Sequence, residues 1–398
     1  MVMIRISGTK LIFFKKQGAS FASFLPLLFF LANLYRLTGH SVMPYFVTLY
    51  AAGVFGLLKL LLDKKCRNPV FFLFFGVYML SGILNGLVVG NSDYNDFFLN
   101  LLLFGVTVTM FAYPMTYLQG VVFFYISIAA FLPAYFGGIS TGLVLTSSGN
   151  YISVLLVLTA AMYYIALQNS GRAVRIYDLF PALLSYLLSI WGRGRGGIVA
   201  CLFLFVMMMI YYGRHVVRKK NARFLIAVLV LFAVAAVVLI GDVDFLDYFM
   251  NLGKWRTRGT DNTARLLIWD SYFDKMGESA VYVFGGAPLD EIPRISAYGG
   301  NTHNSFLQLH ATNGVLNLVF VFVLFVYALV HEVRHGQTML AIALLTLFIR
   351  GMTDKFIFGQ YGMPVMLYLV FYPFYSFFVK RKAVAPEGID LVERMEQV

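Results

Sequence analysis

Long apolar runs, separated by short polar segments, recur along almost the whole chain. Most runs have about 17–22 residues, the length that an α-helix needs to cross the hydrocarbon core of a bilayer, and the fourth, seventh and eleventh are shorter. The runs do not show the alternating segments of about ten residues that are typical of outer-membrane barrels. The pattern predicts about twelve membrane spans, near residues 21–38, 42–62, 69–89, 97–112, 117–136, 151–167, 179–191, 196–212, 224–241, 305–330, 337–350 and 360–379.

The composition agrees with this pattern. Hydrophobic residues make up 60% of the chain, charged residues only 13%, and 40 residues are Phe. Soluble domains carry about 25% charged residues. A single core surrounded by water could not bury so much apolar surface, so lipid is expected to cover it. The predicted fold class is all-α: a polytopic membrane protein with one long periplasmic loop that contains short helices.

The distribution of Lys and Arg predicts the orientation. With the N-terminus inside, most of the 31 Lys and Arg residues fall in cytoplasmic segments, as the positive-inside rule requires. The basic start runs into the first span without a small-residue cleavage site, so we expect this span to be retained and both termini to be cytoplasmic. Several basic residues remain on the outward side and need a separate reason: Arg36, Arg193, Arg195, Lys254, Arg256, Arg258, Arg265, Lys275, Arg294, Arg350 and Lys355.

One connection is far longer than the others. Residues 241–304 form an outward loop of about sixty residues, and loops of this length are usually functional. Within it, Asn262 to Met276 is predicted to form an amphipathic helix, whose apolar residues are Leu266, Leu267, Trp269, Tyr272 and Phe273. The predicted organisation is therefore about nine N-terminal spans in 1–240, the loop in 241–304, about three spans in 305–380, and a cytoplasmic tail in 381–398.

Several function classes are disfavoured. No acidic residue falls in the middle of a predicted span, whereas ion-coupled transporters usually need an intramembrane carboxylate. The only cysteines, Cys66 and Cys201, lie on the cytoplasmic side and inside a span, so they are not expected to pair or to bind a metal. No metal site or cofactor is predicted. The net charge of +12 does not indicate a nucleic-acid partner, because its inner part reflects topology and attraction to anionic lipid.

The candidate chemistry lies on the outward face. A Gly-rich turn, residues 191–197, carries Arg193 and Arg195 between two spans. Its glycines would let the backbone approach a ligand closely, and guanidinium groups bind phosphate oxygens in a bidentate manner. The alternative is a hairpin whose arginines reach toward lipid headgroups. A third arginine, Arg265, lies on the predicted loop helix, where a solvated face or an ion pair with Asp261 is the alternative.

The loop ends in a second group of polar residues. His303 and Asn304 immediately precede the tenth predicted span, and an imidazole there could accept a proton near neutral pH. The alternative is that this polar group only caps the helix. His310 is expected to pack inside the helix. Arg350 and Asp354, at the outer end of the eleventh span, could form an ion pair that closes the site.

Together these features resemble the O-antigen ligase and O-antigen polymerase superfamily of bacterial envelope glycosyltransferases. The resemblance covers about the second half of the chain: an Arg-Gly turn, an arginine on the loop helix, and the string from His303 to Gly314. The family pattern is His, then Asn, Ser or Gln, nine residues, Gly, two residues, and Gly, Thr or Tyr. His303, Asn304 and Gly314 fit it, whereas Asn317 departs from the last position, and Gly194 replaces the usual hydroxyl residue of the turn.

The resemblance implies inverting, metal-independent glycosyl transfer on the periplasmic side of the bacterial inner membrane. Its substrates would be undecaprenyl-pyrophosphate-linked glycans, both donor and acceptor, within membrane lipid, with a chain-length regulator and a flippase as candidate partners. Arg195, Arg265 and His303 would be catalytic, and Arg193, Asn304 and Arg350 would bind substrate. The departures from the pattern favour a polymerase over a ligase that transfers the glycan to the lipid A core. A flippase for lipid-linked oligosaccharides and a cell-wall polymerase remain as alternatives, although the latter class relies on an acidic loop residue.

Overall fold

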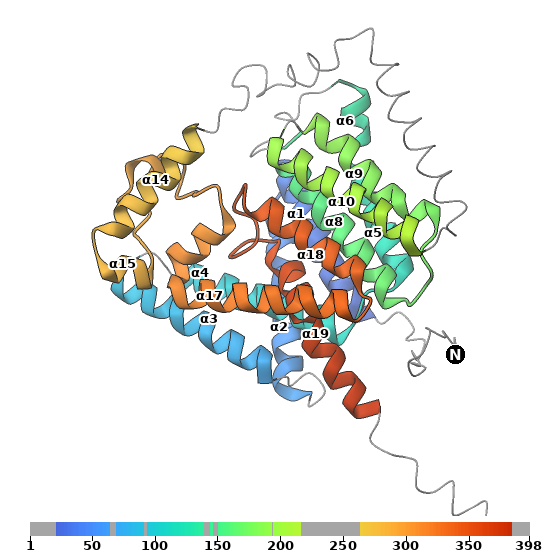
Figure 1. The fold of residues 1–398 in the computed structure, drawn as a ribbon, viewed down its shortest axis with the longest axis horizontal. Coiled ribbons are helices and arrows are strands. Elements are labelled where there is room, and N and C mark those ends of the chain that lie inside the picture. Colours follow the sequence, from blue (N-terminus) through green and yellow to red (C-terminus); the bar gives the residue numbers. More distant parts are fainter. Residues whose placement is uncertain are drawn as a thin grey trace, which may run out of the picture.

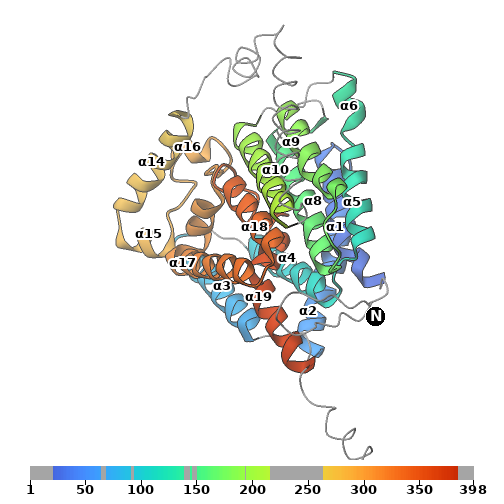
Figure 2. The ribbon, with the colours of Figure 1, turned by 45° about the vertical axis from the view of Figure 1, so that its right-hand side comes forward.

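The computed structural model describes residues 21–63, 69–90, 94–138, 144–145, 150–192, 194–215 and 263–383. Helices account for nearly all of these residues, and none of them lies in a β-strand. The predicted all-α class is therefore confirmed for the described part of the chain. Figures 1 and 2 show the helices gathered in one bundle, with α14, α15 and α16 at its edge beside one end of α17.

Every predicted span that falls within the described residues has a helix at its place. Six of these helices are long and apolar enough to cross a membrane, and five shorter helices are also apolar. The ninth predicted span, 224–241, lies outside the described residues, so the total of about twelve stays a prediction. In the N-terminal half the elements are η1 (Phe21–Phe24), α1 (Leu25–Leu37), α2 (Met43–Leu62), α3 (Pro69–Val88), α4 (Tyr94–Ala112), α5 (Tyr117–Ala129), α6 (Leu132–Phe136), α8 (Asn150–Asn169), η2 (Ile176–Leu179), α9 (Phe180–Trp191) and α10 (Arg195–His215).

The C-terminal half consists of the loop helices and three further helices. The loop helices are α14 (Thr263–Gly277), α15 (Ala280–Gly285) and α16 (Pro293–Ser296), followed by α17 (Ser305–Arg334), α18 (Thr338–Gly351) and α19 (Met363–Ala383). Within the predicted loop 241–304, residues 241–262 lie outside the described part of the chain. α14 (Thr263–Gly277) lies where a helix was predicted from Asn262 to Met276.

α8 forms the centre of the bundle. In the apolar stretch of this helix, 89% of the residues are buried inside the protein. In the other five candidate spans, the buried share is between 28% and 44%. α8 packs against α5, α9, α10 and α18. The surrounding helices keep one apolar face exposed, which is the arrangement expected where lipid is the solvent.

The tenth predicted span is interrupted near its start, which differs from the continuous helix that we expected. Gly314 has φ 74° and ψ 176°, so the helix breaks there into a short first part and a long second part. A Cβ at Gly314 would lie 2.4 Å from the carbonyl oxygen of Phe284, so only glycine fits. Asn85 of α3 donates a hydrogen bond of 2.9 Å to the Ala311 carbonyl, which the break would otherwise leave without a partner in the helix.

The loop helices have a small hydrophobic core of their own. Ile268 and Tyr272 of α14 pack with residues of the following loop, of α16 and of α17: Ala287, Leu289, Ile292, Ile295 and Ala311. Our assignment of the apolar face of α14 was only partly right, because Leu266, Leu267 and Phe273 are exposed. The core holds α14 firmly against the first part of α17.

Candidate functional site

The glycines of the Arg195 turn pack against the protein itself. Arg195 is the first residue of α10, and a Cβ at Gly196 would lie 2.3 Å from Oγ1 of Thr353. A Cβ at Gly197 would lie 1.9 Å from Oγ of Ser153 on α8. We had expected these glycines to bring backbone close to a ligand; instead they bring the start of α10 against α8 and the segment after α18. Arg193 lies outside the described residues.

This close packing leads to a prediction for Gly196→Ala. The added methyl group would push Thr353 away, and overpacking of this kind costs about 1–3 kcal/mol. We expect a lower unfolding temperature in detergent and weaker function, because Thr353 also contacts Arg350. The control is Gly76→Ala in α3, where nothing lies within 4 Å of the added Cβ. Equal stability of the two variants would show that the close contact is not needed.

The expected ion pair between Arg350 and Asp354 is present. Arg350, the penultimate residue of α18, is 2% exposed, and its Nη2 lies 3.2 Å from Oδ2 of Asp354. Its Nη1 donates a hydrogen bond of 3.0 Å to Oγ1 of Thr353, the same hydroxyl that packs against Gly196. The guanidinium also lies over the ring of Phe356. These contacts hold Arg350 in place beside the start of α10.

Ser305 joins this segment to the start of α17. Its hydroxyl donates a hydrogen bond of 2.7 Å to the Asp354 carbonyl and accepts one of 3.1 Å from the Phe356 amide. The preceding residue, Asn304, is the N-cap of α17, and its side chain accepts hydrogen bonds from the amides of Phe306 and Leu307. The oxygen of Asn304 is thus used for capping, and its proposed contact with substrate would have to come from the amide nitrogen.

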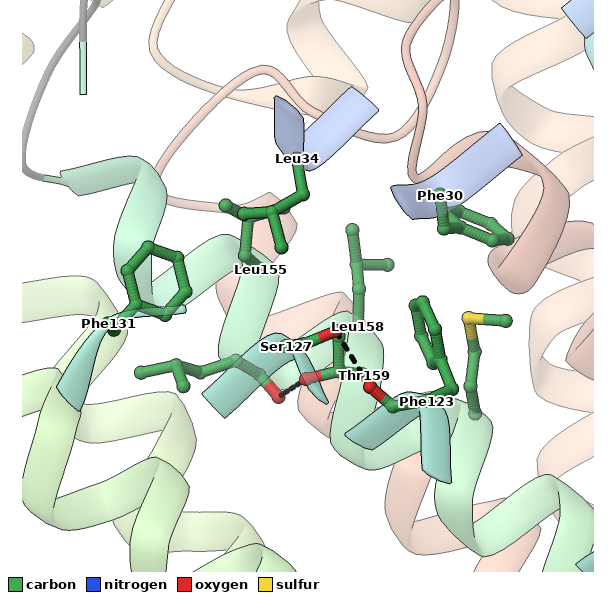
Figure 3. Close-up of a pocket in the computed structure, with 10 residues that line it drawn as sticks. Phe30, Leu34, Phe123, Ser127, Phe131, Leu155, Leu158 and Thr159 are labelled. Carbon is green, nitrogen blue, oxygen red and sulfur yellow. Dashed lines mark hydrogen bonds between the residues drawn. The ribbon is translucent and has the colours of Figure 1, made fainter. Parts of the chain in front are cut away.

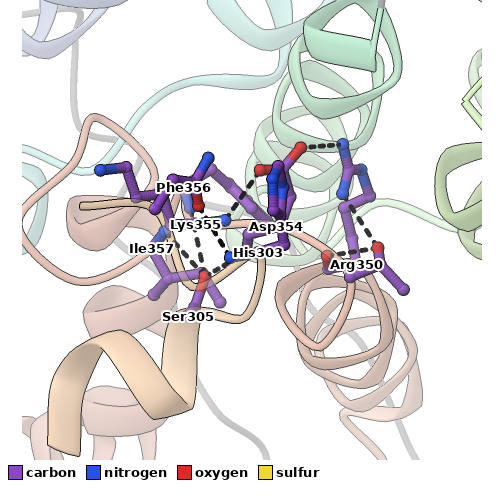
Figure 4. Close-up of polar contacts among 9 residues, drawn as sticks. His303, Ser305, Arg350, Asp354, Lys355, Phe356 and Ile357 are labelled. Atoms are coloured by element: carbon purple, nitrogen blue, oxygen red, sulfur yellow. Dashed lines mark hydrogen bonds and ion pairs between the residues drawn. The ribbon is translucent and has the colours of Figure 1, made fainter. Parts of the chain in front are cut away.

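His303 lies in this polar group, next to Asp354 and Lys355 (Figure 4). It has φ 53°, and it is the only residue other than glycine with a positive φ in the described part of the chain. Its amide donates a hydrogen bond of 2.8 Å to Oδ1 of Asn301, and its ring meets that of Tyr298 edge to face. A left-handed backbone at a histidine is strained, and such strain concentrates at functional sites.

Arg265 completes the group from the side of the loop helices. Burial lowers the pKa of its guanidinium, Asp354 raises it, and the like charges of Arg350 and Arg195 lower it further. Arg265 of α14 therefore lies within electrostatic range of Asp354 and of two other arginines, Arg195 of α10 and Arg350 of α18. Nε1 of Trp269, on the same helix, donates a hydrogen bond of 3.0 Å to the Thr302 carbonyl, which joins α14 to the segment that carries His303.

His310 packs inside the protein, as expected. It is 3% exposed, and its Nδ1 lies 2.7 Å from the Tyr272 hydroxyl. Its Nε2 lies 2.9 Å from the Val283 carbonyl. A carbonyl only accepts, so Nε2 carries the proton and Nδ1 accepts from Tyr272. Both nitrogens are used in structure, which leaves His303 as the histidine of the polar group.

Sequence reasoning missed the contribution of α1. Arg36, at the end of α1, donates a hydrogen bond of 2.9 Å to Asn33 and lies over the ring of Tyr45, with 4.3 Å to its centroid. The hydroxyls of Tyr151 and Tyr361 lie within electrostatic range of Arg36, and also of Arg350 and Asp354. Arg36 therefore borders the same polar group. The sequence did hold one indication of this role, because Arg36 is one of the basic residues predicted on the outward side.

A crevice elsewhere in the bundle does not suit this chemistry. A crevice between α1, α5 and α8 is lined by apolar side chains, and the hydroxyls of Ser127 and Thr159 are bonded to carbonyls of their own helices (Figure 3). It offers no charged group for chemistry. Within the described residues, no group of three His, Cys, Asp or Glu side chains is placed to hold a metal ion.

The fold and the exposed apolar helices define a multi-pass membrane protein. Residues 180–322 match the family model described as O-antigen ligase, and the matched segment contains Arg195, Arg265 and His303. This segment is therefore similar to the O-antigen ligase family, and the match supports membership of the O-antigen ligase and polymerase superfamily. Members of this family are glycosyltransferase-like enzymes, and the family implies lipid-linked glycan substrates at the membrane. No curated protein matches the chain.

Proposed function

We propose that this protein is an inverting, metal-independent glycosyltransferase that polymerises undecaprenyl-pyrophosphate-linked repeat units at the periplasmic face of the inner membrane. The proposal rests on Arg265, which lies within electrostatic range of both Arg195 and Arg350, and on the polar group in which Figure 4 draws Arg350 with His303. The family match supports the class of reaction. The product would be O-antigen or a related surface polysaccharide.

The arginines suit the pyrophosphate of the donor. Three guanidinium groups beside one carboxylate leave an excess of positive charge, which a pyrophosphate would neutralise. As the bond between the anomeric carbon and the phosphate oxygen breaks, the electron pair leaves with the pyrophosphate. Arg195 and Arg265 would stabilise the charge that develops there, with Arg193 and Arg350 binding the same group. The arginines would thus do the work that a metal ion does in other transferases.

His303 suits the role of general base. The acceptor hydroxyl oxygen attacks the anomeric carbon from the side opposite the pyrophosphate, so the configuration inverts. The imidazole of His303 would take the proton of that hydroxyl. Asn304 follows His303 directly, and its amide nitrogen could donate a hydrogen bond to the acceptor sugar. Arg350 and Asp354 would close the side of the site that faces α10.

Two acceptors are compatible with this chemistry. A polymerase passes the growing glycan to another lipid-linked repeat unit, whereas a ligase passes it to the sugar core of lipid A. Asn317 in place of the usual last residue of the family pattern favours the polymerase. The description of the matching family as O-antigen ligase favours the second candidate. A lipid-linked oligosaccharide flippase is a more distant alternative, since it would need charges along a path inside the spans.

Deletion of the gene in its host separates these functions. We expect the surface glycan of the deletion strain to run on a gel as core plus a single repeat unit, because a missing polymerase still leaves one unit to be ligated. Bare core would instead identify a ligase. An unchanged ladder would contradict both assignments. Restoring the ladder with the wild-type gene on a plasmid is the control for secondary effects of the deletion.

A further inference from the structure

α15 has an exposed face that is entirely apolar. The exposed fractions of Val281 and Phe284 are 46% and 69%, and Val283 between them is 39% exposed. α14, the longest of the loop helices, is different, because its exposed Leu266 and Phe273 alternate with the exposed carboxylates Asp270 and Asp274. The mixed polar and apolar face of α14 is compatible with exposure to water. The apolar face of α15 would be unfavourable there.

α15 is fixed to the ends of two candidate spans. The Val283 carbonyl accepts a hydrogen bond from His310 of α17, at 2.9 Å, and a Cβ at Gly286 would lie 2.3 Å from the His310 carbonyl. Asn85 of α3 donates a hydrogen bond to the Gly285 carbonyl. Figures 1 and 2 both show α15 beside the neighbouring ends of α3 and α17. Its position relative to the membrane is therefore set by those helices.

The helices beside α15 also expose apolar side chains at this level. On α3, Leu87 and Val88 are 79% and 62% exposed, and the next residue, Val89, lies 3.3 Å from the position of a Cβ at Gly285. On α17, Leu316 is 65% exposed and lies two residues after Gly314, whose backbone approaches the Phe284 carbonyl. The exposed face of α15 thus continues the faces that α3 and α17, as membrane spans, turn to lipid.

We propose that α15 is an interfacial membrane anchor whose Val281 and Phe284 insert among the acyl chains of the adjoining leaflet. Burial of such a face in the boundary between headgroups and acyl chains is favourable. The charged groups near α15 are compatible with this depth, because Lys275 pairs with Glu278 and Glu291 and lies over Tyr282, within reach of the headgroups. The anchor holds α14, with Arg265, at the height where a lipid-linked substrate presents its headgroup.

Site-directed spin labelling tests this placement without any assay of glycosyl transfer. The chain has only two cysteines, Cys66 and Cys201, so Cys66→Ser and Cys201→Ala give a background for single labels. Labels are placed by Phe284→Cys and Val281→Cys in the full chain, reconstituted in liposomes. Leu316→Cys on α17 is the lipid-facing reference, and Phe273→Cys on α14 is the matched control for an exposed aromatic residue of the same loop.

We expect the labels at 281 and 284 to collide with oxygen, which dissolves in the acyl region, several times more often than with a water-soluble nickel complex. The label at 316 should likewise collide more often with oxygen than with the nickel complex. The label at 273 should collide more often with the nickel complex. If the labels at 281 and 284 follow the one at 273 while the label at 316 stays lipid-facing, α15 lies in water and the proposal is wrong. Comparison within this set keeps the result independent of whether the enzyme is a polymerase or a ligase.

Discussion

Replacement of His303 is expected to slow glycosyl transfer by about 100- to 10,000-fold, the range that loss of a general base gives. The structure adds a choice of variant to this prediction. Because His303 has φ 53°, alanine at this position would be strained as well as unable to accept a proton. His303→Asn is the sharper test, because asparagine tolerates a left-handed backbone and removes the base alone. The measurement is the length distribution of the glycan in a deletion strain carrying each variant.

The control for this prediction is His335→Ala, since His335 is an exposed histidine at the end of α17 far in sequence from His303. It should restore the wild-type ladder. Both His303 variants should reach the membrane at wild-type levels, which a blot of the membrane fraction checks. If His303→Asn supports full-length glycan at a normal rate, the histidine only shapes the turn and another group takes the proton.

The helices of this protein could be predicted closely because lipid imposes a simple rule. A span needs a fixed length of apolar residues, and polar loops mark its ends. α2, predicted at 42–62 and observed as Met43–Leu62, shows how well this works. The rule failed at Gly314, because an apolar run with a glycine in it looks continuous in hydropathy. Only the contact between Gly314 and the Phe284 carbonyl shows why the helix must break there.

The candidate site was only partly predictable. The pair Arg350 and Asp354 could be proposed because both residues lie at the outer end of the eleventh predicted span, and the structure shows it at 3.2 Å. The roles of the other residues remain proposals, although the structure brings Arg195 and Arg265 near this pair. No sequence pattern could show that Ser305 would bind the Asp354 carbonyl, or that Trp269 would bind the Thr302 carbonyl. These contacts join segments that are far apart along the chain, and they depend on how the helices pack.

Packing between helices also explains why the expectation for Gly196 and Gly197 was wrong. A Gly-rich turn next to arginines is typical of a phosphate-binding loop, and we expected the small residues to face a ligand. The close neighbours of these glycines are instead Thr353 and Ser153. The requirement for glycine is therefore one of helix packing, as at other small-residue contacts between membrane helices. Arg195 gains its position from that packing.

Arg265→Ala is expected to lower the rate of glycosyl transfer by about 100- to 1,000-fold, as the loss of one group that stabilises developing charge does. Burial lowers the pKa of Arg265 more than Asp354 raises it, and the charges of Arg350 and Arg195 lower it further, so a second anion would stabilise this cation. A pyrophosphate would supply that anion. Arg265→Lys should recover only part of the rate, because an ammonium group cannot bind two oxygens in the bidentate geometry of arginine.

The matched control is Arg294→Ala, which removes an exposed arginine of α16 in the same loop and should leave the glycan ladder unchanged. Purified enzyme and lipid-linked repeat units extracted from the host give the rate, and the level of each variant in the membrane shows that it folds. If Arg265→Ala and Arg294→Ala lower the rate of glycosyl transfer equally, the loop acts only through its overall charge. A large loss for Arg265→Ala with wild-type activity for Arg294→Ala would instead support a specific contact between Arg265 and the pyrophosphate.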